Sequence, residues 1–179
     1  MDKITISNKQ LLDFHQGLES IRHLRGAKFG YAISRTTRSI DPQVRSLQDA
    51  AKYSEDYQEY ILSREQAGLP FAVKTEDGSP LYDLYDGELF LKILPEKEGE
   101  FKDILVSLEK KFTKAIRQHK AQQLEYRDLL KQHVEIDVFS IEQELLPEGI
   151  TLGQAFRILP MILENPRLPL IPCSFKNSI

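Results

Sequence analysis

The chain of 179 residues contains one cysteine, Cys173, so it has no disulfide within itself. A reduced thiol fits the cytosol, where structural disulfides are rare. The sequence also lacks a stretch of roughly 18 consecutive apolar residues, which a membrane-spanning helix needs. Its first residues, Met1-Asp2-Lys3, do not open a basic region followed by an apolar run, as a secretion signal would. We therefore expect a soluble cytoplasmic protein with no membrane partner.

The common signatures of catalysis are missing as well. No glycine-rich loop of the phosphate-binding kind follows a strand, and no serine stands in a nucleophile-elbow context. The four histidines include no pair at the i, i+4 spacing of a helical zinc site. His119 and His133 lie on a helical stripe, where packed histidines are more typical than ligands or bases. We predict a protein that is not an enzyme, with no catalytic residue, metal or cofactor.

Acidic residues are plentiful between Glu55 and Asp103. Paired carboxylates can bind Mg²⁺ or act as general acid and base. These acids, however, fall on a helix flank and at expected hairpin turns, where carboxylates usually solvate the surface. A hydrolase or nuclease therefore stays an alternative, and it requires at least three carboxylates around one cleft.

The longest helical pattern that is present runs from Phe101 to His133. Its stripe positions are spaced alternately by four and three residues, as in a helix that lies along a long partner. They are Phe101, Leu105, Leu108, Phe112, Ala115, His119, Gln122, Tyr126, Leu129 and His133. A chain of this length suits one domain with a real core. We expect this helix to be organised for contact along its whole length.

A second helical stripe extends from Phe29 to Ile61. Asp41-Pro42 interrupts it, and we expect a fresh start or a kink there, because proline is well tolerated only in the first turn of a helix. From Pro42 to Ala67 this helix would be about 39 Å long. With a connection from Gly68 to Gly99, it can return antiparallel to the helix Glu100 to His133, which gives a helical hairpin of the coiled-coil type.

Both stripes become small or polar about halfway along. These positions are Ala50, Ala51 and Ser54 on one helix, and Ala115, His119 and Gln122 on the other. Close approach of the two helices is the favoured interpretation. A pocket or a docking place for a third helix is the alternative.

Short elements are expected around the helical hairpin. Lys3 to Ile6 alternates like a strand and should pair with the alternating segment from Val134 to Val138. Ser7 with Gln10, and Thr151 with Gln154, have the form of capping boxes that open helices. Turn signals at Asp77-Gly78 and Asp86-Gly87 indicate a small antiparallel meander over residues 71–94.

The end of the chain differs in composition from the rest. Pro166, Pro169 and Pro172 stand among apolar residues, which favours an extended segment that cannot build a core alone. We therefore predict an α+β fold: a single domain over residues 1–163, made of an antiparallel pair of long helices with a small antiparallel sheet, and a docked proline-rich tail over 164–179. Docking on its own domain and docking on a neighbouring subunit both stay open.

Charge is unevenly distributed although the net charge is only -3. Between Arg22 and Arg45, six bases stand against Asp41 alone, which gives that segment +5. Lys110 to Lys131 also carries +5, from seven bases and two acids. If the helices return antiparallel, both basic segments meet at one end and the acids at the other.

A basic end of this kind can hold nucleic acid, an acidic protein surface or the acidic end of another copy. The candidate nucleic-acid-binding residues are Arg22, Arg25, Lys28, Arg35 and Arg38. Phe29, Tyr31 and Tyr126 are available to stack on bases. A solvated helix face with no partner is the plain alternative, because exposed helices are commonly rich in lysine and arginine.

The layout of the chain resembles small proteins of unknown function encoded by tailed bacteriophages and prophages. The likeness rests on Lys3-Ile4-Thr5-Ile6 leading into a helix, long charged helices, a hairpin region with Asp77-Gly78, Val134-Glu135-Ile136-Asp137, and Leu145-Leu146-Pro147 to Leu152. It covers residues 1 to 163 in layout. It implies a phage-encoded accessory protein that acts by binding in the host cytoplasm, and it supplies no functional residues.

These observations lead to one functional expectation and one rival. We predict a non-catalytic protein that binds a host or phage protein, as an assembly factor or as an inhibitor of a host or defence protein, and that self-associates into a homo-oligomer. The rival is a nucleic-acid-binding accessory protein that uses the basic helix end. The identity of the partner is not encoded in any motif of the chain.

Overall fold

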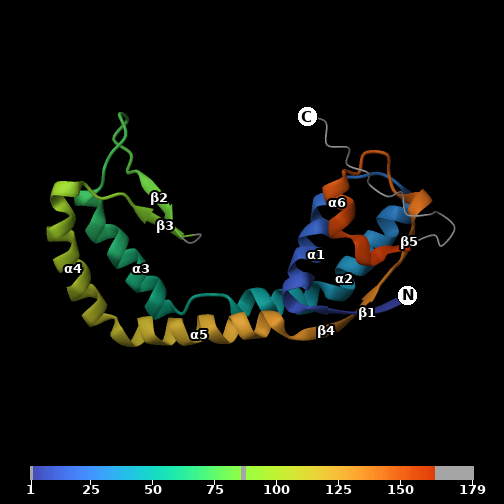
Figure 1. Ribbon diagram of the computed structural model, residues 1–179, viewed down its shortest axis with the longest axis horizontal. Helices are drawn as coiled ribbons and strands as arrows, with labels where there is room; N and C mark the ends of the chain where they lie inside the picture. The colour runs from blue at the N-terminus through green and yellow to red at the C-terminus, as the bar shows by residue number, and fades with distance from the viewer. Residues whose placement is uncertain (1, 86–87, 164–179) are drawn as a thin grey trace, which may run out of the picture. The chain divides into compact units, whose positions relative to one another are not determined.

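The computed structural model describes residues 2–85 and 88–163 (Figure 1). The fold is α+β, as predicted: helices dominate, and the strands form small two-stranded pairs. Among the described residues, those up to Ala50 and from Asp128 onward form one compact unit, and residues 51–127 form a second. The sequence predicts one domain over residues 1–163 where the structure has these two units. The predicted tail, residues 164–179, lies outside the described residues.

The sheet of the first unit joins two distant parts of the chain. Strand β1 (Asp2–Ser7) pairs antiparallel with β4 (His133–Val138), with Ile4 opposite Ile136. Alternate residues of the pair turn inward, and Ile136 and Val138 are buried. The predicted pairing of these two strands is confirmed.

Helix α1 (Asn8–Ile21) starts directly after β1. The Ser7 hydroxyl accepts a hydrogen bond from Gln10 N at 3.2 Å, and Ser7 N donates to Gln10 Oε1 at 2.8 Å. This reciprocal pair satisfies two backbone N–H groups that a helix start leaves unpaired, and it confirms the predicted capping box. The helix buries Leu11, Phe14, Leu18 and Ile21 on one face.

Helix α2 (Ala27–Ala50) runs through Pro42 without interruption. The fresh start expected at Asp41-Pro42 is wrong, and so is the separate helix from Pro42 to Ala67, whereas the kink stays a prediction. The apolar residues before and after the proline, from Phe29 to Leu47, form one buried stripe, so burial holds both halves in a single helix. Pro42 itself lies on the exposed side of the helix. Proline has no N–H to donate to the carbonyl four residues earlier, and on this side water can donate that hydrogen bond instead.

The chain leaves the helical conformation over residues 51–54 instead. Ser54 then caps α3 (Glu55–Gly68), and its hydroxyl accepts a hydrogen bond from Tyr57 N at 3.3 Å. Gln122, one of the polar stripe positions, donates its side-chain amide to the Lys52 carbonyl at 2.8 Å, within this irregular segment. At least one of the polar positions halfway along the stripes, Gln122, therefore satisfies a backbone carbonyl in the break between α2 and α3.

The second long helix is also divided. Helix α4 (Glu98–Lys111) and helix α5 (Thr113–Lys131) are separated at Phe112, whose φ of -99° and ψ of 18° are not helical. The single helix predicted from Glu100 to His133 is wrong in this respect. Phe112 is buried and lies 5.7 Å from the ring of Tyr60, so an aromatic contact fixes the break.

Within the second unit, α3 and α4 pack antiparallel. The end of α3 meets the start of α4, because a Cβ on Gly68 would lie 3.2 Å from Phe101. At the other end, Glu59 forms an ion pair with Lys111 at 3.6 Å. An antiparallel helical pair is therefore present, although each helix has only 14 residues.

A hairpin connects these two helices. Strand β2 (Tyr82–Tyr85) pairs antiparallel with β3 (Glu88–Leu91), in the region predicted as a meander. Short 3₁₀ helices flank it at η1 (Leu69–Phe71) and η2 (Pro95–Lys97). The turn predicted at Asp77-Gly78 is confirmed by the positive φ of 84° at Gly78, whereas the Asp86-Gly87 turn lies outside the described residues.

The remaining elements belong to the first unit. Strand β5 (Ile141–Glu142) pairs in parallel with β6 (Ile162–Leu163), and η3 (Gln143–Leu145), α6 (Leu152–Arg157) and η4 (Leu159–Met161) lie between them. Thr151 and Gln154 form the predicted capping box at the start of α6. Helix α6 packs on α1, as Figure 1 shows, and Ile158 and Met161, which follow α6, join α1 and α2 in the core.

The contact between α1 and α6 gives a stability prediction at Gly17. A Cβ at this position would lie 2.6 Å from Arg157 Cβ, so we expect Gly17→Ala to lower the free energy of unfolding by about 1–3 kcal/mol. Gly30→Ala on α2 is the control, because its Cβ would meet nothing within 4 Å. That change should raise the free energy of unfolding by about 0.5–1 kcal/mol. Urea unfolding measures both, and equal shifts would contradict the close contact.

Candidate functional site

The five residues predicted to bind nucleic acid fall on two neighbouring segments of the first unit. Lys28, Arg35 and Arg38 lie on α2, whereas Arg22 is the C-cap of α1 and Arg25 follows it in the connection to α2. All five are exposed. The structure therefore brings three of them onto one helix and places the other two just before it.

The outward face of α2 is basic along most of its length. At about 100° per residue, Lys28, Arg35, Arg38 and Arg45 fall within an arc of roughly 100°, opposite the buried stripe. The distance along the helix from Lys28 to Arg45 is about 25 Å. Asp49 is the one carboxylate of α2 in the same arc. Arg45 is absent from the sequence-based set, although it continues the spacing of seven and three residues that joins the other cations.

Phe139, which follows β4, supports part of this face. The guanidinium carbon of Arg35 lies 5.0 Å from the centre of the Phe139 ring, and Tyr31 meets the same ring edge-on at 6.3 Å. Such cation–π contacts contribute about 0.5–1 kcal/mol at exposed sites. Arg35 and Tyr31 are thus held in place before any ligand arrives. We call Lys28, Tyr31, Arg35, Arg38 and Arg45 the basic face.

The other cations of the basic face are available to a ligand. Lys28, Arg38 and Arg45 form no ion pair within the described part of the chain. Tyr31 is 62% exposed, so its ring is accessible. Phe29, by contrast, is 2% exposed and belongs to the core, and its predicted role in stacking is wrong.

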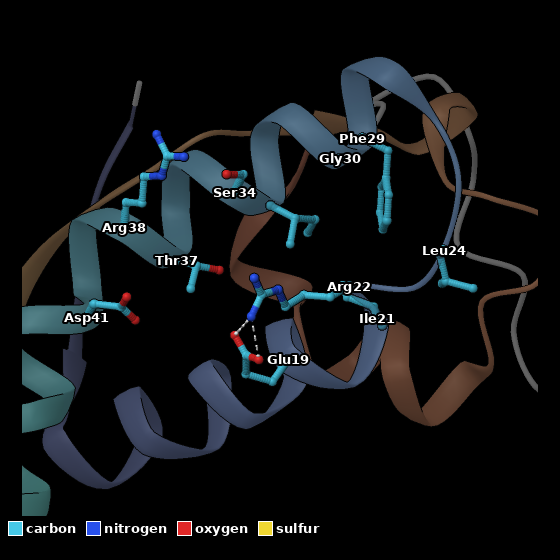
Figure 2. A pocket seen from close by; sticks show the side chains of 11 residues that line it. Glu19, Ile21, Arg22, Leu24, Phe29, Gly30, Ser34, Thr37, Arg38 and Asp41 are labelled. Atoms are coloured by element: carbon cyan, nitrogen blue, oxygen red, sulfur yellow. Dashed lines mark hydrogen bonds and ion pairs between the residues drawn. The ribbon is translucent and has the colours of Figure 1, made fainter.

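A groove of about 350 Å³ lies between α1 and α2, beside the basic face (Figure 2). Arg22 and Arg38 line it together with Glu19 and Asp41, so its charges balance. Arg22 is bound to Glu19 by hydrogen bonds of 3.0 and 3.3 Å, drawn as dashed lines in Figure 2. The groove therefore has no excess positive charge, and Arg22 has a partner within the fold.

A second groove, of about 610 Å³, lies in the second unit between α3 and the β2–β3 hairpin. Its walls are mainly aromatic and aliphatic, and it contains one cation and one carboxylate, Arg64 and Glu65. We call it the tyrosine groove, after Tyr53, Tyr57 and Tyr82; its other apolar lining residues are Ile61, Leu89, Phe90, Leu91 and Phe101. Leu84 and Leu89, opposite each other on the hairpin, are each 70% exposed.

Polar contacts fix the side chains of the tyrosine groove. The Tyr82 hydroxyl donates a hydrogen bond to Glu65 at 2.9 Å, and this bond to the carboxylate raises the pKa of Tyr82. Arg64 lies over the Phe90 ring at 4.4 Å. The Tyr57 ring stacks on His119, with ring centres 3.7 Å apart. His119 is thus a buried packing partner of the groove wall, as expected for a histidine on a stripe.

The ring centre of Tyr60 lies 5.6 Å from that of Tyr57, and burial raises the pKa of Tyr60. The tyrosine groove has no signature in the sequence, because its walls come from three segments that only the fold brings together. The weak signal that exists is the run of apolar and aromatic residues on both sides of the hairpin turn.

No protein family model, no curated protein sequence and no solved structure matches this chain. In the part that the structure describes, no helix is both long enough and apolar enough to cross a membrane. Over the same residues, no three histidine, cysteine or acidic side chains come together in a way that could hold a metal ion. The candidate sites therefore rest on geometry and charge alone, and the resemblance to bacteriophage proteins stays a prediction.

Two neighbouring threonines give a prediction for the support of the basic face. The Thr36 hydroxyl is fully buried and accepts a hydrogen bond from Phe139 N at 2.9 Å, so Thr36→Val should lower the free energy of unfolding by about 1–3 kcal/mol. Thr37 lines the groove of Figure 2, and its buried hydroxyl oxygen has no hydrogen-bond partner within the described residues.

Thr37→Val is therefore the matched control and should leave stability unchanged or raise it by about 1 kcal/mol. Chemical denaturation of both variants checks the pair. A larger loss at Thr37 than at Thr36 would show that the hydrogen bond to Phe139 is not what joins α2 to the end of β4.

Proposed function

We propose that this protein is a non-catalytic accessory protein that binds an acidic surface of another protein through the basic face of α2. The observation that carries the proposal is the alignment of four cations and one exposed tyrosine on a single helix face about 25 Å long. Arginine and tyrosine are enriched at the centres of protein interfaces. An interface of standard size needs a continuous surface, and this face provides one side of it.

The rigidity of the basic face supports binding. Helix α2 is anchored along its opposite side, and the ring of Phe139 holds Arg35 and Tyr31. Side chains that are ordered in advance lose less conformational entropy on association, so more of the contact energy appears as affinity. Lys28, Arg38 and Arg45, which form no ion pair among the described residues, add electrostatic complementarity to an acidic partner.

A protein partner suits the overall charge better than nucleic acid does. The net charge of -3 gives no long-range attraction to a polyanion, so recognition has to come from the local face. We infer that the partner presents a compact acidic patch that matches one helix face. The proposal that the partner is a host or a phage protein rests on the resemblance alone. The same holds for the proposal that binding assists assembly or inhibits the partner.

One observation favours nucleic acid as a second candidate. Tyr31 is 62% exposed and lies among cations, and single-stranded nucleic acid is held by the combination of backbone charges and stacked bases. This candidate predicts binding that weakens steeply with salt, because phosphate contacts release counterions. Gel-shift titrations with single- and double-stranded DNA and RNA at two salt concentrations separate it from the protein-binding proposal.

The proposal predicts the effect of reversing two charges on the basic face. Arg38→Glu with Arg45→Glu should weaken capture of the partner from nuclease-treated host lysate by about tenfold or more, since two cations become repulsive toward an acidic patch. Capture on immobilised protein with quantitative mass spectrometry measures the loss. Neither arginine has an ion pair within the described residues, so folding should be unaffected.

The matched control is Lys114→Glu with Lys120→Glu on α5. Both lysines are exposed, and the pair changes the net charge by the same amount. Capture that falls equally in both double variants would show a general charge effect and would refute a site on α2. Capture that disappears on nuclease treatment of the wild-type sample would transfer the role to nucleic acid.

A further inference from the structure

The tyrosine groove follows the outer edge of strand β3. Three consecutive residues of this strand line it, Leu89, Phe90 and Leu91, whereas among the described residues β2 contributes Tyr82 alone. The lining residues that the structure describes all belong to the second unit. The groove is therefore a cleft in which the edge of a β-strand forms one wall.

One face of helix α3 forms the opposite wall. Tyr57, Ile61 and Arg64 line the groove at successive helical positions, which place them on the same side of the helix. Arg64 lies over the Phe90 ring, and Leu91 lies against the last residue of α3, so strand and helix run alongside each other. Figure 1 shows the hairpin beside α3 in this way. The space between them is elongated, as an extended chain requires.

The backbone of β3 presents unpaired groups to this groove. Lys92 N donates a hydrogen bond to the Leu81 carbonyl at 2.9 Å, so the backbone of Lys92 faces β2. Backbone groups of alternate residues point to opposite edges of a strand, so Phe90 also faces β2, while Leu89 and Leu91 face outward. Within the described chain, no strand pairs with β3 on that outer edge. Its outward N–H and C=O groups are available to another strand.

The side chains beside this edge also favour a covering strand. Leu89 is 70% exposed, as is Leu84 opposite it on β2. An unpaired strand edge next to exposed leucines is a template for strand pairing. In β-strand addition, backbone hydrogen bonds hold the incoming segment, and its alternate side chains enter the pockets beside it. Tyr57 and Ile61, both half-buried on the facing helix, provide such an apolar surface.

The charge of Arg64 adds a chemical preference. Arg64 forms no ion pair among the described residues, whereas the Glu65 carboxylate already accepts a hydrogen bond from Tyr82. The Phe90 ring holds the guanidinium group beside the open edge of β3. A carboxylate on an incoming strand would form a charge-assisted hydrogen bond there, and such bonds are stronger than neutral ones.

We propose that the tyrosine groove binds an extended segment of another protein, which adds to the outer edge of β3 as a further strand. Apolar residues alternate along this segment, and one acidic side chain of the segment meets Arg64. The proposal does not depend on the function proposed for the basic face of α2, because it uses other residues and another unit.

A peptide library selected on the immobilised full chain supplies the probe. It displays short peptides with valine, leucine or isoleucine at alternate positions and random residues between them. We expect peptides that bind and that share an aspartate or glutamate. Each selected peptide is then synthesised in two forms, with N-methyl groups on one or the other set of alternate residues. Only one set of N–H groups can face β3, so one form should lose affinity by about tenfold or more and the other should keep it.

Two proline variants locate the binding edge. Proline has no N–H, and at an outward position of an edge strand it leaves the ladder intact. Leu89→Pro should therefore weaken binding of the selected peptides by about tenfold or more. Leu84→Pro is the matched control, because Leu84 is equally exposed and its N–H points away from the opposite edge of the hairpin. Its affinity should stay within about twofold of the wild type.

A second pair of variants avoids the strands. If Leu89→Pro disturbs the hairpin, Ile61→Glu on the groove wall replaces it and should weaken binding to the same extent. Leu62→Glu, at a neighbouring side chain of α3 that is 56% exposed and does not line the groove, is its control and should preserve affinity.

The proposal fails if the library yields no binder, if both methylated forms bind equally well, or if each variant and its control lose the same affinity. It also fails if no peptide is selected and the free protein forms a dimer that Leu89→Pro dissociates. That result would assign the groove to a second copy of the chain.

Discussion

The burial of one face of α2 is the constraint on which the candidate interface depends. Its stripe from Phe29 to Leu47 is covered by α1 and by β4 with the segment after it. Hydrogen bonds add direction to this packing: Thr36 accepts from Phe139 N, and the Ser39 hydroxyl donates to the Asp137 carbonyl at 2.8 Å. These contacts fix the rotation of the helix about its axis, because any rotation would break them. The cations on the opposite side of the helix therefore face outward. A rigid row of positive charge is thus a consequence of core packing.

Local sequence signals predict much of this fold. Both capping boxes, the pairing of β1 with β4 and the turn at Gly78 are found where the residues place them, because each depends on a few neighbouring groups or on simple alternation. The helix boundary predicted at Pro42 is absent from the structure. The break at Phe112 is present in the structure, but the sequence pattern does not predict it. At Pro42 a long buried stripe outweighs the preference of proline for a helix start, and at Phe112 a contact with Tyr60 interrupts an otherwise regular pattern. Both outcomes are decided by tertiary packing, which no local window contains.

The candidate sites differ in the same way. The basic face is largely predictable, since its cations share one helix and helical spacing places them together; only the burial of Phe29 and the exposure of Tyr31 require the structure. The tyrosine groove is not predictable, because residues from α3, the hairpin and α4 form it jointly. The two sites also differ in chemistry: the basic face is charged, whereas the tyrosine groove is mainly aromatic and aliphatic.

The most direct measurement of the central claim is arginine footprinting of the complex with its captured partner. An arginine-specific reagent modifies exposed guanidinium groups, and mass spectrometry reports each site separately. The account predicts that Arg38 and Arg45 become protected in the complex, while Arg117, an exposed arginine on α5, stays as reactive as in the free protein. Continued reactivity of Arg38 and Arg45 in a complex that protects Arg117 would contradict a binding site on α2.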